Sequence, residues 1–107
     1  MSLSQMNRDV YLTIVFLGDI DVQKAFMVGK EVAEKRRIGF NGLSIYYHQL
    51  ATPVITQSLV FIINSGEANS VIEETLEKMQ LDLKAVRIVM TPIPQTVEAQ
   101  PTKGQYI

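Results

Sequence analysis

His48 is the side chain in this sequence best suited to acid–base chemistry near neutral pH, and it is the only histidine. It lies in the run YYHQ at residues 46–49, where strand alternation would put Tyr46 on the same face. A catalytic base is conceivable here, but no motif places a nucleophile or an acid beside it. We favour a half-exposed histidine on an edge strand. The segment that carries His48, Thr52 and Pro53 could also line a pore or a ligand pocket, although a plain hairpin loop is the simpler interpretation.

Two other groups of residues invite a chemical interpretation. Asp19 and Asp21 could bind a cation, but two acids between a strand and a helix more often cap the helix. Gly66 stands in a turn that lacks the glycine spacing of a phosphate-binding loop. We therefore expect no catalytic residue, no cofactor site and no metal site, and we predict that the protein is not an enzyme.

Composition excludes several classes of function. The chain has no cysteine, which excludes disulfides, thiolate catalysis and thiolate ligation of zinc or iron–sulfur clusters within it. One histidine excludes a histidine-rich metal site in a single chain, but not a ring of His48 side chains at a symmetry axis. Ten basic residues against 11 acidic residues give a net charge of −1, which argues against nucleic acid as the main partner.

The apolar runs are short. Residues 14–17 and 59–63 fall far below the ~18–20 residues of a membrane span, so we expect no membrane partner. The first residues, MSLSQMNRD, lack the apolar core of a signal peptide, and a cytoplasmic location is the expectation.

Apolar spacing predicts four strands and two helices. The first helix is expected to begin after Asp21 and end near Arg37, and Ser70 with Glu73 has the form of a capping box for the second. The elements expected are strands over residues 10–17, 43–50, 59–63 and 85–91 and helices over about 22–37 and 70–79. Residues 51–57 would connect two strands, or residues 54–56 would lengthen a hairpin.

The order β-α-β-β-α-β predicts an α+β fold: a ferredoxin-like βαββαβ sandwich, with a four-stranded antiparallel sheet and two helices on one face. In that fold the first and third strands are central, and these are the two most apolar strands here. We predict one domain over residues 9–94 and an extended C-terminal tail over residues 95–107.

Two helices cover one face of a sheet and leave the other open. The first strand is apolar on both faces, so Tyr11, Val15 and Leu17 are expected to point to the open face, with Phe61 from the third strand. An uncovered apolar patch of this kind usually marks an interface. We therefore predict a homo-oligomer that associates through these four residues. In the alternative, the C-terminal tail folds back and covers the face within one chain.

Parts of the sequence resemble bacterial microcompartment shell (BMC) domains. AFMVGKEVAEK at residues 25–35, followed by Ile38-Gly39-Phe40, is similar to their first helix and next strand. SLVFIINSGEANSVIEETL at residues 58–76 resembles their later strand, turn and second helix, and VRIVMTPIP at residues 86–94 resembles their final strand. The resemblance spans about residues 10–94 and implies a hexameric tile with a central pore and no catalysis. The glycine-rich pore loop of the family is missing.

Small regulatory βαββαβ modules of the ACT or nitrogen-regulator type have the same order of elements and bind a metabolite at an oligomer interface. Their ligand-binding glycine motifs are not visible here. The expected function is thus a non-enzymatic structural subunit of a homo-oligomeric assembly. The alternative is a ligand-binding regulatory module.

Overall fold

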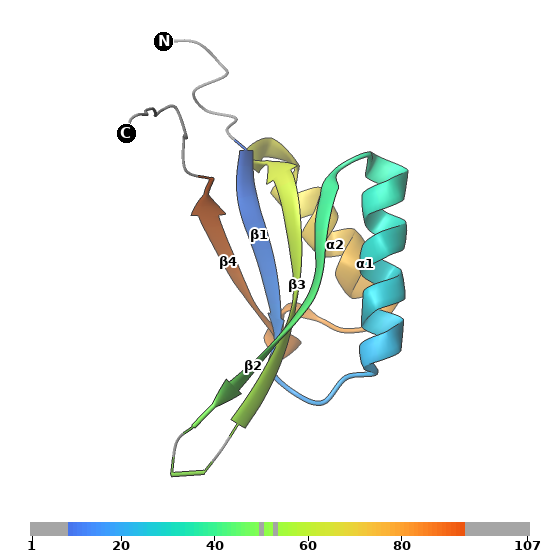
Figure 1. Cartoon of the computed structure of the whole chain (residues 1–107). Helices are drawn as coiled ribbons and strands as arrows, with labels where there is room; N and C mark the ends of the chain where they lie inside the picture. The colour runs from blue at the N-terminus through green and yellow to red at the C-terminus, as the bar shows by residue number, and fades with distance from the viewer. Residues whose placement is uncertain (1–8, 50, 53, 94–107) are drawn as a thin grey trace, which may run out of the picture.

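The computed structural model describes residues 9–49, 51–52 and 54–93. It contains four strands, two α-helices and two short 3-10 turns, η2 (Ser65–Glu67) and η3 (Leu83–Ala85) (Figure 1). The main elements, in chain order, are β1 (Asp9–Phe16), α1 (Val22–Arg36), β2 (Gly39–His48), β3 (Val54–Asn64), α2 (Ala68–Met79) and β4 (Val86–Pro92). The predicted α+β class, with a four-stranded antiparallel sheet and two helices, is confirmed. The predicted tail over residues 95–107 lies outside the described residues.

The sheet has the strand order β2-β3-β1-β4, and every neighbouring pair is antiparallel. The central strands are therefore β1 and β3, as their apolar sequences predict. A bulge interrupts the β2–β3 ladder between Phe40 and Leu43. Gly42 lies in this bulge with φ +86°, a conformation that favours glycine over residues with a side chain.

One face of the sheet forms the core together with both helices. Leu12 and Ile14 of β1 lie opposite Phe61 and Leu59 of β3, and none of these four side chains is exposed to solvent. Buried residues of α1 and α2 belong to the same apolar cluster, among them Val32, Val71 and Leu76. Figure 1 shows α2 behind the sheet and α1 beside it, to the right of β2.

The observed ends of the two helices match the predicted ends only in part. Asp21 caps α1 as predicted, because its side chain accepts a hydrogen bond from the Lys24 backbone N–H at 3.1 Å. The helix ends at Arg36, where Arg37 takes a left-handed conformation with φ 57°. The predicted capping box was wrong: α2 begins two residues before Ser70, directly after the η2 turn, and its first residue, Ala68, is buried.

The most important difference from the sequence prediction is the length of β3. The expected strand covered residues 59–63, whereas β3 begins at Val54 and pairs with β2 from that residue onward. The structure therefore has the longer hairpin, in which residues 54–56 belong to a strand, and not the long connection over residues 51–57. The added residues of β3 form part of an exposed surface.

Candidate interaction surface

The outer part of the β2–β3 hairpin extends beyond the rest of the sheet. The last residue of β1, Phe16, lies opposite Gln57, so residues 54–56 of β3 have no partner in β1. Among the described residues, their pairing partners are residues 46–48 of β2 alone. We call residues 45–49, 51–52 and 54–56 the arm. It projects from the lower end of the sheet in Figure 1 as a two-stranded ribbon.

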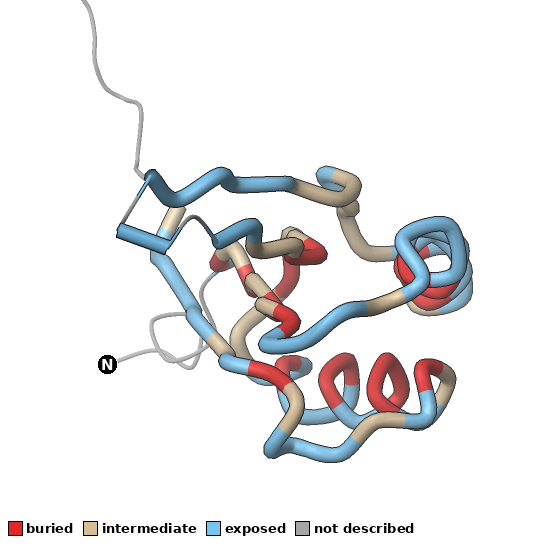
Figure 2. Tube along the Cα trace, turned by 90° about the horizontal axis from the view of Figure 1, so that it is seen from below, coloured by how far each residue is buried: buried red, intermediate tan, exposed pale blue. Residues whose placement is uncertain are grey.

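The arm exposes large apolar and aromatic side chains on both of its faces. Tyr46 is 59% exposed and Tyr47 is 61% exposed, although they are adjacent residues of one strand and point to opposite faces. Across the ladder, Ile55 is 60% exposed and lies opposite Tyr47. Figure 2 shows the exposed residues following one another along the arm, in contrast to the buried stretches of the helices.

The arm carries no charged side chain, and neither does the sequence on either side of it. Residues 38–66 contain no Asp, Glu, Lys or Arg. Lys and Arg neutralise the phosphates in most nucleic-acid interfaces, and this stretch of the sequence contains neither. Its exposed area instead suits another uncharged, apolar surface of a protein.

His48 lies on this arm and is exposed. Its Nε2 atom is 2.9 Å from the Thr56 hydroxyl oxygen, across the ladder of β2 and β3. Tyr46 is directly opposite Thr56, so Tyr46, His48 and Thr56 share one face. His48 therefore contacts a residue of the neighbouring strand β3. Its own strand, β2, is at the edge of the sheet, in agreement with the edge-strand interpretation of this histidine. Thr52 is exposed in the turn of the hairpin, and Pro53 lies outside the described residues.

Of the four residues predicted at the interface, three lie at or near the open face of the sheet and one lies in the core. Tyr11 and Val15 lie on the open face of β1 and are half-buried, and Leu17, directly after β1, is 59% exposed. Phe61 was predicted wrongly, because it lies on the opposite face of β3 and is fully buried in the core. Both alternate sets of residues in β3 are apolar, so alternation alone could not decide which set faces the helices.

A shallow groove lies between the arm and the turn that follows β1. Its apolar lining residues are Phe16, Leu17, Val54 and Ile55, and Asp19 lies at its rim. Leu17 therefore connects the open face of the sheet with the base of the arm. The exposed apolar surface is largest on the arm and becomes smaller toward the centre of the open face.

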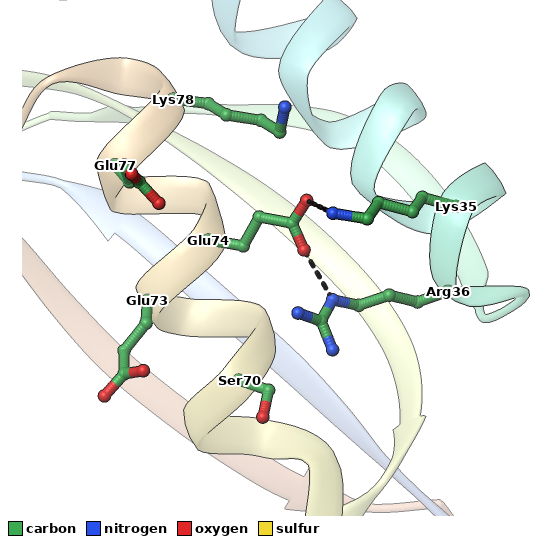
Figure 3. Close-up of a pocket in the computed structure, with 7 residues that line it drawn as sticks. All are labelled: Lys35, Arg36, Ser70, Glu73, Glu74, Glu77 and Lys78. Carbon is green, nitrogen blue, oxygen red and sulfur yellow. Dashed lines mark hydrogen bonds and ion pairs between the residues drawn. The ribbon is translucent and has the colours of Figure 1, made fainter.

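A second, polar cleft lies between α1 and α2 (Figure 3). Glu74 of α2 accepts hydrogen bonds from Arg36 Nε at 2.6 Å and from Lys35 Nζ at 3.1 Å. Its side chain is 9% exposed, although helical spacing alone places it on the solvent side of α2 together with Glu73 and Glu77. The last turn of α1 packs over this position, a tertiary contact that helical spacing does not reveal.

The electrostatics of this cleft indicate a structural role. Burial raises the pKa of the Glu74 carboxyl, but the hydrogen bonds from Arg36 and Lys35 and the attraction of both cations outweigh burial and lower the pKa below its ordinary value. A carboxylate held ionised by two cations is a poor proton donor or acceptor near neutral pH. The cluster joins α1 to α2. Glu74 supplies the negative charge for Lys35 and Arg36 in the last turn of α1, so these two cations need no external anion.

Within the described residues, no group of three or more His, Asp or Glu side chains is arranged to hold a metal ion. No helix in the described part of the chain is both long and apolar enough to cross a membrane. No protein-family model matches the sequence, and no curated protein matches it either.

Proposed function

We propose that this protein is a non-enzymatic subunit that associates with copies of itself through the arm. The observation that carries the proposal is the uncharged, two-stranded arm with Tyr46, Tyr47 and Ile55 each about 60% exposed. A hairpin of two strands is at best marginally stable in water by itself. A neighbouring subunit that covers the arm would both stabilise it and bury its aromatic side chains.

We further infer that the fold is the ferredoxin-like βαββαβ sandwich. The central position of β1 and β3 in an antiparallel sheet supports this inference, as does the single core shared by the sheet and both helices. A tile of a microcompartment-like shell is one assembly that such a subunit could form. The sequence resemblance supports that narrower proposal. Substitutions in the arm can test whether the subunits associate.

Charged substitutions in the arm test the proposal. Tyr46→Asp and Ile55→Asp each place a carboxylate in the surface that a neighbour would bury, and we expect either change to lower the solution mass of the assembly. The measurement is light scattering after size exclusion at several protein concentrations. Met27→Asp in α1 is the matched control, because Met27 is also 58% exposed but lies far from the arm.

The wild type and Met27→Asp should have the same mass, a multiple of the 12.0 kDa chain. An arm variant that folds, shown by circular dichroism, and retains the full mass would contradict the proposal. A wild-type protein that is monomeric at all concentrations would contradict it as well.

A further inference from the structure

A second surface of this fold is open to pairing, at the opposite edge of the sheet from the arm strand β2. This edge is β4, whose only strand neighbour in the described sheet is β1 (Figure 1). Met90 is 50% exposed and Val89 is 39% exposed, and Leu83, just before the strand, is 65% exposed. Natural edge strands are usually protected by charged residues, but Arg87 is the one charged residue of β4.

Within the described part of the chain, the backbone of β4 has hydrogen-bonding groups along this edge that no other strand uses. The Leu17 N–H donates to the Ala85 carbonyl at 2.9 Å, in the same register as the Phe16–Val86 pair. Hydrogen-bonded and non-hydrogen-bonded pairs alternate in an antiparallel ladder. The odd-numbered residues of β4 therefore bond to β1, and Val86, Ile88 and Met90 direct their N–H and C=O groups outward. Pro92 has no N–H to offer.

An apolar groove runs beside this edge, between β4 and α2. Its volume is about 350 Å³. The apolar residues that line it are Ala68, Ile72, Leu76, Leu83, Ile88 and Met90. A strand added to β4 would place side chains over this groove and extend the core beyond the edge.

The sequence of β4 is compatible with a second copy of itself, related by a two-fold axis through Ile88. In the antiparallel register centred there, Ile88 meets Ile88 of the partner subunit, and Val86 meets Met90 of the partner subunit. Among the described residues, none bonds to the outward N–H and C=O groups of these three residues, so every hydrogen bond of the pairing can form. Arg87 then lies opposite Val89 of the partner subunit, which avoids repulsion between the two arginines.

Charges at the ends of β4 are complementary in the same arrangement. Lys84 lies in η3, two residues before β4 begins, and Glu67 directly precedes α2. Ala68, the first residue of α2, lines the same groove as Met90 near the end of β4. An antiparallel pairing brings the beginning of one β4 to the end of the other, so Lys84 lies at the same end of the pairing as the partner subunit's Glu67.

From these observations we infer that β4 is a dimerisation edge, at which two copies of this chain join their sheets by antiparallel β4–β4 pairing around Ile88. This interface is separate from the arm, and it does not depend on the function proposed above.

The test uses a Tyr46→Asp background, in which association through the arm is removed and β4 pairing should leave a dimer. Met90→Pro in this background deletes an outward N–H that the chain's own sheet does not use. Met90→Ala is the matched control, since it shortens the same side chain but keeps the N–H. We expect the mass by sedimentation velocity to fall twofold for Met90→Pro, from two chains to one, and to change less for Met90→Ala.

A Tyr46→Asp protein that is already monomeric would overturn β4 pairing and leave the arm proposal intact. A folded Met90→Pro variant that remains dimeric would overturn it too. Ile88→Cys gives an independent readout, because the chain has no cysteine of its own. Across a hydrogen-bonded pair the Cα atoms are about 5.5 Å apart, within the range for a disulfide. Oxidation should give a covalent dimer for Ile88→Cys and not for Met27→Cys.

Discussion

At the scale of single residues, the most informative side chain is Glu74, because its role depends on a contact between helices. Its carboxylate is nearly buried and is held by Arg36 and Lys35. Helical spacing assigned Glu74 to the solvent face, and no local pattern in the sequence could show that α1 ends above it. The periodicity of one helix cannot show a charged pair with a distant element, because the pair depends on how the elements pack.

Glu74→Gln should destabilise the fold in a pH-dependent way. The pKa of this carboxyl is lowered in the folded state, so its stabilising contribution is present above the ordinary value of 4.5 and is lost as the pH falls through the folded-state pKa. We expect a loss of about 1–3 kcal/mol in the free energy of unfolding at pH 7. Urea denaturation of the wild type and of Glu74→Gln at pH 7 and at about pH 3 measures this loss. The difference in the free energy of unfolding between the two proteins should be smaller at the lower pH.

Glu73→Gln, an exposed neighbour on the same helix, should change the free energy of unfolding by less than about 0.5 kcal/mol. An equal effect of the two substitutions, or a Glu74→Gln effect that grows in acid, would show that the ion pairs do not stabilise the fold.

Gly29 shows how close the helix α1 lies to the sheet. A Cβ atom at this position would be 2.6 Å from the ring of Phe40, whose neighbours are the rings of Phe26 and Phe61. Gly29→Ala gains about 1 kcal/mol in helix propensity, but we expect the clash to outweigh it and to give a net loss of about 1–2 kcal/mol. Thermal unfolding measures the effect. In a Phe40→Leu background the same change should be neutral or stabilising, and a stabilising effect in the wild type would disprove the close approach.

At the scale of elements, apolar periodicity predicted which segments are strands and which are helices, but it did not predict all of their ends. The limits of β1 differ from the expected residues 10–17 by one residue at each end, and the cap of α1 at Asp21 was correct. The strand β3 was predicted too short because Thr56, Gln57 and Ser58 interrupt its apolar run. These polar residues belong to the strand because they pair with β2, and pairing partners are not visible in a local window.

The arm was therefore the feature that the sequence predicted least well, although one signal for it was available. The long run without charged residues from 38 to 66 sets the arm and the adjoining strands apart from the helices. Strand alternation put Tyr11 and Val15 on the correct face of the sheet and Phe61 on the wrong one. Residues 59–63 are apolar at every position, so no polar set marks their solvent side.

At the scale of the whole molecule, the described residues leave two surfaces of the fold uncovered, and we propose both as sites of association between subunits. The arm exposes aromatic side chains, whereas the β4 edge exposes backbone groups beside an apolar groove. Two interfaces of different kinds on one subunit can build assemblies larger than a dimer.

The central claim is that a neighbouring subunit covers the arm, and backbone hydrogen exchange measures this most directly. In the isolated chain, residues 46–48 and 54–56 form a two-stranded ribbon and should exchange rapidly. We expect their amides to be protected at high protein concentration and to lose this protection on dilution or in Tyr46→Asp, while the amides of β1 stay protected. Rapid exchange of the arm at every concentration, in a protein whose core is protected, would contradict it.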